Sequence, residues 1–143
     1  MVKVITFRHR HAFLLSLTVL TGCPGHGDYI RSDEITTVST RGDNVCFSVP
    51  EPEDYQPVSI SIVPRGTRFR ERQITFDPTL RIVNGQLCIP PSFHHFPDKG
   101  QFIVRYVLHS ERHKDTPRRM VAGVEIAGEC IFDIPLNDME AVR

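Results

Sequence analysis

The sequence predicts an all-β fold, an antiparallel β-sandwich. Many short segments alternate apolar with polar residues, which is typical of strands that bury one face. Turn-forming residues separate nearly all of these segments, and no stretch of useful length has helical periodicity. Short strands at this spacing indicate a sandwich or a barrel. The predicted strands cover residues 35–40, 44–49, 57–63, 72–76, 80–83, 86–89, 101–108, 118–126 and 129–134.

The clearest turn is the Asn84-Gly85 pair, which lies between two of these strands. Both residue types tolerate a positive φ, which a type I′ turn requires. We therefore expect a hairpin that joins residues 80–83 to residues 86–89. The other turns are predicted at residues 41–43, 51–54, 64–66, 77–78 and 97–100.

The strand order is indicated by an Asp-x-Gly-x-Phe motif at residues 98–102, which an alternating apolar strand follows. The motif resembles the corner that introduces strand F of immunoglobulin-like domains, with Phe102 in place of the usual tyrosine. This resemblance implies that residues 44–49, 86–89 and 118–126 take the places of strands B, E and G. The predicted fold class is therefore an immunoglobulin-like β-sandwich.

Two cysteines, Cys46 and Cys88, point away from the core face, because apolar residues fill the alternate positions of their strands. Strands B and E are neighbours in an immunoglobulin-like sheet, so we expect the two cysteines to form a cross-strand disulfide. An exported protein meets oxidising conditions, which favour the bond. In the chain-entropy model, a loop of this span stabilises a fold by about 4 kcal/mol.

A further cysteine, Cys130, lies in the last predicted strand on the same side as Phe132 and Ile134. We expect Cys130 to be a small core residue rather than a reactive thiol. The alternative pairing of Cys130 with Cys46 or Cys88 stays open, because connectivity does not follow from sequence alone.

The amino-terminal segment predicts export. Lys3, Arg8 and Arg10 form a positive region, and residues 12–20 form a largely apolar stretch too short to span a membrane. The Leu-Thr-Gly-Cys sequence at residues 20–23 resembles the lipobox of bacterial lipoproteins. Export and lipidation are therefore expected together.

The lipobox resemblance implies that residues 1–22 are removed and that Cys23 carries diacylglycerol and fatty acids such as palmitate. More than one acyl chain gives stable anchoring, because each buried methylene contributes about 0.8 kcal/mol. Pro24 stands where an aspartate would favour retention in the inner membrane, so we expect the periplasmic side of the outer membrane. The expected domains are a lipidated tether over residues 23–34 and the sandwich over residues 35–143.

Charge and motifs exclude several function classes. The chain has 17 basic and 17 acidic residues, and because three basic residues lie in the signal segment, the mature protein is mildly acidic. This balance argues against a nucleic-acid partner. No Gly-x-Ser-x-Gly or His-Glu-x-x-His motif occurs, so we expect neither an enzyme nor a cofactor. We interpret the histidines as loop residues rather than metal ligands. They are His94, His95, His109 and His113.

Two segments are candidates for binding a protein partner. Arg65, Arg68, Arg70 and Arg72 form a basic run, and the last three share one face if the segment is extended. Such a stripe either docks an acidic partner or guards a sheet edge against strand pairing. Phe93 and Phe96 lie in a proline-bounded loop, where they either form an interface or cap the end of the sandwich.

Several motifs resemble one family. The lipobox with Pro24 and Gly25, the strand Asn44–Pro50, Tyr55-Gln56-Pro57, and the segments Asn84–Pro91 and Gly100–Tyr106 resemble small enterobacterial lipoproteins described as type VI secretion immunity proteins. This resemblance implies that the protein binds and neutralises a toxin delivered to the periplasm. The alternative is a structural or accessory outer-membrane lipoprotein that binds another envelope component. A third reading is a sandwich that binds a small ligand or metal through its histidines.

Overall fold

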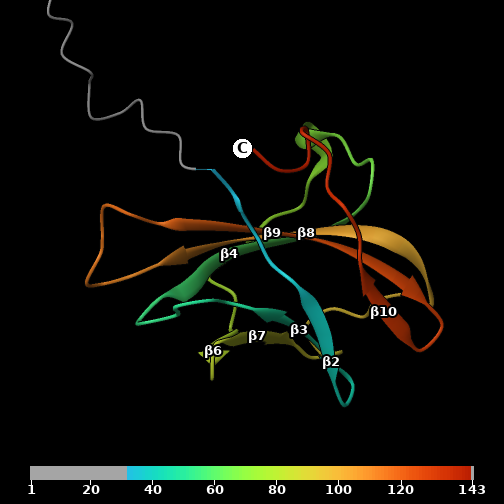
Figure 1. Ribbon diagram of the computed structural model, residues 1–143, viewed down its shortest axis with the longest axis horizontal. Coiled ribbons are helices and arrows are strands. Elements are labelled where there is room, and N and C mark those ends of the chain that lie inside the picture. The colour runs from blue at the N-terminus through green and yellow to red at the C-terminus, as the bar shows by residue number, and fades with distance from the viewer. Residues whose placement is uncertain (1–31, 143) are drawn as a thin grey trace, which may run out of the picture. The chain divides into compact units, whose positions relative to one another are not determined.

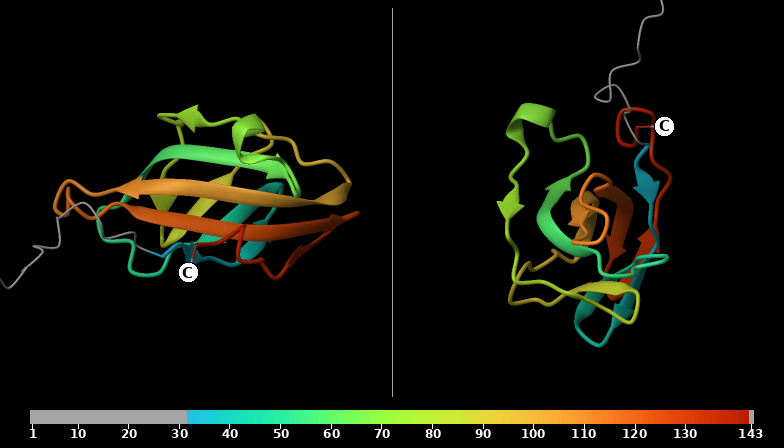
Figure 2. Two further views of the ribbon diagram at one scale, coloured as in Figure 1. Left: turned by 90° about the horizontal axis from the view of Figure 1, so that it is seen from above. Right: turned by 90° about the vertical axis from the view of Figure 1, so that its left-hand side faces the viewer.

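The computed structural model describes residues 32–142, which form two facing β-sheets (Figures 1 and 2). The signal segment and Cys23 lie outside the described residues. One 3-10 helix, η2 (Phe69–Glu71), occurs among the strands. Within residues 32–142, no helix has the length and apolar character needed to cross a membrane. The strands are β1 (Glu34–Ile35), β2 (Val38–Arg41), β3 (Asn44–Ser48), β4 (Gln56–Pro64), β5 (Thr75–Phe76), β6 (Ile82–Val83), β7 (Gln86–Ile89), β8 (Lys99–His109), β9 (Arg118–Ala127) and β10 (Cys130–Asp133).

The two sheets have the immunoglobulin-like strand order. The short sheet runs β2-β3-β7-β6, and the long sheet runs β1-β9-β8-β4-β5, with β10 also paired to β9. All neighbours are antiparallel except β1, which pairs in parallel with β9. The predicted fold class is confirmed. So are the expected places of β3, β7 and β9 as strands B, E and G.

The first predicted strand, residues 35–40, is divided in the structure, and this corrects the expectation. The Thr36 main-chain N–H donates to Val121 of the long sheet, whereas its hydroxyl donates to the Ser48 carbonyl of the short sheet. The chain therefore changes sheets at Thr36. Folded structure also begins before residue 35, because Glu34 accepts two hydrogen bonds of 2.7 Å from the guanidinium of Arg118.

Two further predicted strands are shorter than expected. In the segment 72–76, only Thr75–Phe76 pairs with β4, because the 3-10 helix occupies the residues just before it. In the segment 80–83, only Ile82–Val83 pairs with β7. The turn that follows is as predicted, with φ of 51° at Asn84 and 72° at Gly85.

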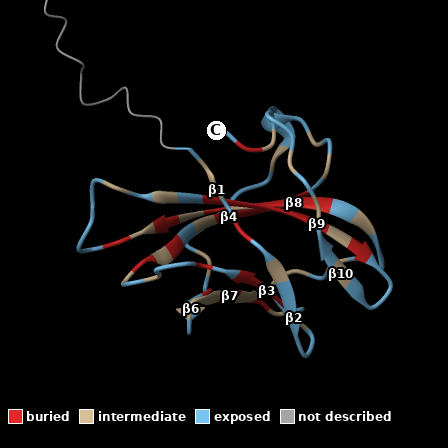
Figure 3. Cartoon of the chain, viewed as in Figure 1, coloured by how far each residue is buried: buried red, intermediate tan, exposed pale blue. Residues whose placement is uncertain are grey.

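The core lies between the sheets, and the alternation seen in the sequence fills it (Figure 3). Val45, Phe47 and Val49 face it from the short sheet, and Phe47 lies 6.1 Å from Tyr106 of β8, measured between ring centroids. Phe102, the residue in the tyrosine position of the corner motif, is buried. Its ring centroid lies 5.6 Å from that of Phe96. The corner is therefore held by aromatic packing.

The Cys46–Cys88 disulfide is confirmed. The two residues are direct cross-strand partners on β3 and β7, with Cα atoms 4.0 Å apart. Neither belongs to the core cluster, as their outward direction predicts. Cys46 is nevertheless fully buried, so the outer face of this sheet is covered at that point.

The prediction that Cys130 lies in the core is wrong, because Cys130 is an exposed free thiol. Its strand neighbour Ile131 packs against the core instead, and Phe132 is half exposed. Alternation along β10 is therefore offset by one residue from the sequence-based assignment.

The carboxyl-terminal residues 134–142, here called the tail, cross the outer face of the long sheet. Leu136 and Ala141 pack there with Ile103 of β8 and Val121 of β9 in a second apolar cluster. Gly123 makes this approach possible, since a Cβ atom at that position would lie 2.7 Å from Ile134. The tail is thus an integral part of this face.

Candidate functional site

The candidate site lies on the outer face of the long sheet, between the tail and the segment of residues 65–72, here called the arginine loop. This loop connects β4 to β5 and contains the 3-10 helix. The right-hand view in Figure 2 shows the loop at the upper left and the tail at the upper right, both above the strands of the long sheet. All four arginines singled out from the sequence lie in the loop, but the structure gives them different roles.

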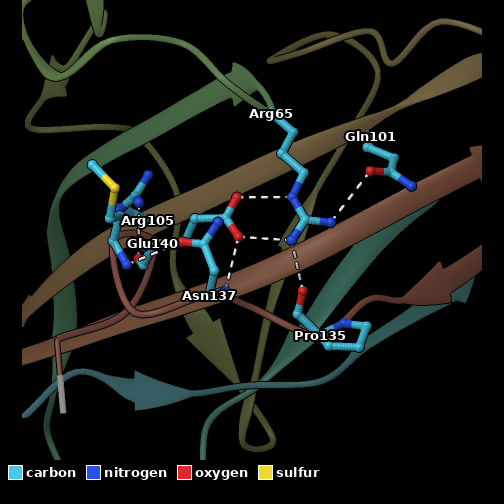
Figure 4. A network of polar contacts seen from close by, with 7 residues as sticks. Arg65, Gln101, Arg105, Pro135, Asn137 and Glu140 are labelled. Atoms are coloured by element: carbon cyan, nitrogen blue, oxygen red, sulfur yellow. Dashed lines mark hydrogen bonds and ion pairs between the residues drawn. The ribbon is translucent and has the colours of Figure 1, made fainter.

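Arg65, one of the arginines predicted to bind a partner, holds the tail. Its Nε donates to Glu140 Oε2 at 2.9 Å and its Nη2 donates to Glu140 Oε1 at 2.7 Å (Figure 4). The same guanidinium also donates to the carbonyl of Pro135 at 2.8 Å. These bonds raise the pKa of Arg65 and lower the pKa of Glu140, because each stabilises the other's charged form. Arg65 is therefore a structural residue.

We predict that Glu140→Ala releases the end of the tail. Charge-assisted hydrogen bonds from Arg65 would be lost, so amide exchange at Ala141 and Val142 should accelerate by about tenfold. The exposed Asp138→Ala is the matched control in the same turn and should leave exchange unchanged. Equal protection in wild type and Glu140→Ala would show that the ion pair does not hold the tail.

Acid should have the same effect as this substitution. The pKa of folded Glu140 lies below its ordinary value, so the ion pair stabilises the attached tail fully only above about pH 4.3. That contribution is lost as the pH falls through the lowered pKa. Amide exchange measured across this range would show the tail opening before β8 and β9 do.

Arg68, Arg70 and Arg72 do not form the extended stripe that the sequence suggested. The amides of Glu71 and Arg72 bond back to the carbonyls of Arg68 and Phe69, and this closes a 3-10 turn. The three side chains therefore do not share one face. Arg72 stacks over the Phe69 ring, with its guanidinium carbon 4.7 Å from the ring centroid.

Large apolar side chains lie exposed beside these arginines. Phe69 is 78% exposed, Phe76 of β5 is 73% exposed, and Met139 of the tail is 90% exposed. Ile74, between the loop and β5, is also exposed. Met139 and Glu140 could not be predicted as site residues, because nothing in the sequence shows that the tail folds back onto the sheet.

The other aromatic candidates, Phe93 and Phe96, cap the sandwich. Both are partly buried and pack against the core. His94 lies edge-on to Phe96 with ring centroids 4.6 Å apart, and burial lowers its pKa. These contacts account for the aromatic loop as an end cap rather than a free binding tip.

His113, in the loop after β8, is also engaged with neighbouring side chains. His113 contacts Glu53 at 2.9 Å and stacks on Tyr55. Glu111 pairs with Lys114 at 3.6 Å on the exposed loop. In the part of the chain that the structure describes, no three His, Cys, Asp or Glu side chains gather closely enough to hold a metal ion.

Comparison with protein families places most of the sandwich in a single group. The sequence model of a family described as a domain of unknown function, DUF7480, matches residues 33–129. The chain belongs to this family. The DUF7480 match includes the arginine loop but ends before β10 and the tail. No curated protein and no solved structure gives a match.

Proposed function

We propose that this DUF7480 protein is a lipid-anchored periplasmic immunity protein that binds and neutralises a toxin delivered by type VI secretion. One observation supports a protein-binding role above all. Phe69 of the arginine loop is exposed beside Arg68 and Arg72, and Phe76 is exposed on β5, the strand that follows the loop. Aromatic and arginine side chains are enriched at protein interfaces, and exposed apolar patches mark interaction sites.

The location of the protein is part of the same proposal. The lipobox-like sequence that ends at Cys23 supports export and acylation, and a lipid anchor would hold the domain where an incoming periplasmic toxin acts. An immunity protein works by binding in equal amounts to its toxin. It therefore needs a contact surface rather than a catalytic centre.

The proposal predicts protection that depends on compartment and on the arginine loop. Cells that export the chain should survive periplasmic delivery of the toxin encoded beside it, whereas cells that keep the domain in the cytoplasm should not. Phe69→Asp should weaken toxin binding by about tenfold or more, because interface aromatics contribute strongly. Val83→Asp is the matched control, since Val83 is 62% exposed on the short sheet.

The accessory-lipoprotein alternative gives a different result. Deletion would then cause an envelope defect without attacking cells, and a pull-down would capture no toxin encoded nearby. That pair of outcomes would contradict the immunity function. Equal loss of protection in Phe69→Asp and Val83→Asp would contradict the role of the arginine loop.

A further inference from the structure

A cavity of about 430 Å³ separates the arginine loop from the turn of the tail. Arg68, Phe69 and Arg72 line it from the loop, and Met139 lines it from the tail. Arg105 of β8 also lines it, and Figure 4 shows this residue beside Glu140 and Asn137. The cavity thus combines several guanidinium groups with two exposed apolar side chains.

The positive charge in this cavity is only partly compensated. Glu140 is the acidic residue that lines it, and Arg65 binds both of its carboxylate oxygens. Among the described residues, no carboxylate forms an ion pair with Arg68, Arg72 or Arg105. An incoming anion would therefore meet a site with uncompensated positive charge.

The positive charges of Arg105 and Arg72 repel each other within this site. Arg105 donates one hydrogen bond of 2.8 Å to the main-chain carbonyl of Glu140. Burial lowers its pKa, and the positive charge of Arg72 lowers it further, against the weaker opposite effect of Asp33 and Glu140. Each arginine is thus placed where a negative partner would relieve repulsion.

A buried donor of the cavity also lacks a partner. The Nε of Arg72, a lining residue, is buried without a hydrogen-bond acceptor. A buried donor without an acceptor costs free energy, which an added oxygen ligand recovers. Together with the charge, this observation indicates an acceptor-bearing ligand.

We propose that this cavity binds a side-chain carboxylate from an acidic loop of the partner protein, with a neighbouring apolar residue packed on Phe69 and Met139. The planar guanidinium fork matches a carboxylate in two parallel hydrogen bonds. The apolar rim favours a peptide over free phosphate, because phosphate has nothing to place against it. The partner's identity as a toxin rests on the proposed function, whereas the carboxylate chemistry does not.

The test uses the mature lipoprotein in neutral detergent and a labelled, end-blocked Leu-Glu-Leu-Glu peptide, with binding followed by fluorescence polarisation. We expect saturable binding that the Leu-Gln-Leu-Gln peptide lacks. Arg72→Gln should weaken binding by about tenfold, because a charge-assisted bond is removed. Arg70→Gln removes the same charge from an exposed position of the same loop outside the cavity, and should leave binding within about twofold.

Three results would overturn the inference. They are no saturable binding of the glutamate peptide, an equal loss in Arg70→Gln and Arg72→Gln, or displacement of the peptide by inorganic phosphate at lower concentration than by N-acetylglutamate. Melting temperatures of both variants check that they fold. Peptide binding in a protein that gives no protection would contradict the proposed function alone. Protection that Arg72→Gln leaves intact, without peptide binding, would contradict the cavity alone.

Discussion

Replacing both Cys46 and Cys88 with alanine is expected to lower the free energy of unfolding by about 4 kcal/mol. The bond joins residues 42 positions apart, so its removal restores conformational entropy to the unfolded chain. For a domain of this size, the melting temperature should fall by roughly 15–20 °C. Urea unfolding monitored by circular dichroism would measure the change in free energy directly.

The control for the disulfide is Cys130→Ala. Cys130 is exposed and unpaired, so this variant should change the free energy of unfolding by less than about 0.5 kcal/mol. Peptide mapping without reductant should recover one linked species that contains Cys46 and Cys88. A linked species containing Cys130, or unchanged stability in the double variant, would contradict the assigned role of this bond.

On the proposal that Cys23 is lipidated and the protein is held at the outer membrane, Cys23→Ala should abolish lipidation and move the protein off the outer-membrane fraction. The alanine has no sulfur to form the thioether, and the lipoprotein peptidase acts on the acylated precursor, so the precursor should remain uncleaved. Without acyl chains, the apolar contribution of about 0.8 kcal/mol per buried methylene is lost. Membrane fractionation and intact-mass measurement would report both effects.

Pro24→Asp is the matched control for anchoring. It keeps the Cys23 sulfur, so the acyl mass should remain, while the protein should shift toward the inner membrane. A wild-type mature protein without acyl mass would rule out the lipoprotein proposal. That outcome would leave the fold and the carboxylate-binding cavity unaffected.

The immunoglobulin-like sandwich was largely predictable because side-chain direction along a strand depends only on position. Alternation in residues 44–49 and 101–108 therefore identified both core faces. The Asn84-Gly85 pair determined its own turn, since few residues accept two successive positive φ angles. The outward direction of Cys46 and Cys88, combined with the expected strand order, was enough to predict the disulfide.

The candidate site depended on contacts between segments far apart in the sequence. Arg65 and Glu140 are 75 residues apart, and only the return of the tail over Gly123 makes them partners. Thr36 likewise divides a continuous alternating segment, because one residue bonds to both sheets.

The sequence by itself thus determined the fold class, the main strands, the hairpin turn and the cysteine pair, all of which follow from local geometry or strand order. Tertiary structure alone decided that, of four similar arginines, Arg65 binds the tail and Arg70 lies outside the cavity. It also decided that Cys130 faces solvent. The physical reason is that the sequence gives a residue's charge and, through alternation, the strand face on which it lies. Its partners depend instead on how distant segments pack.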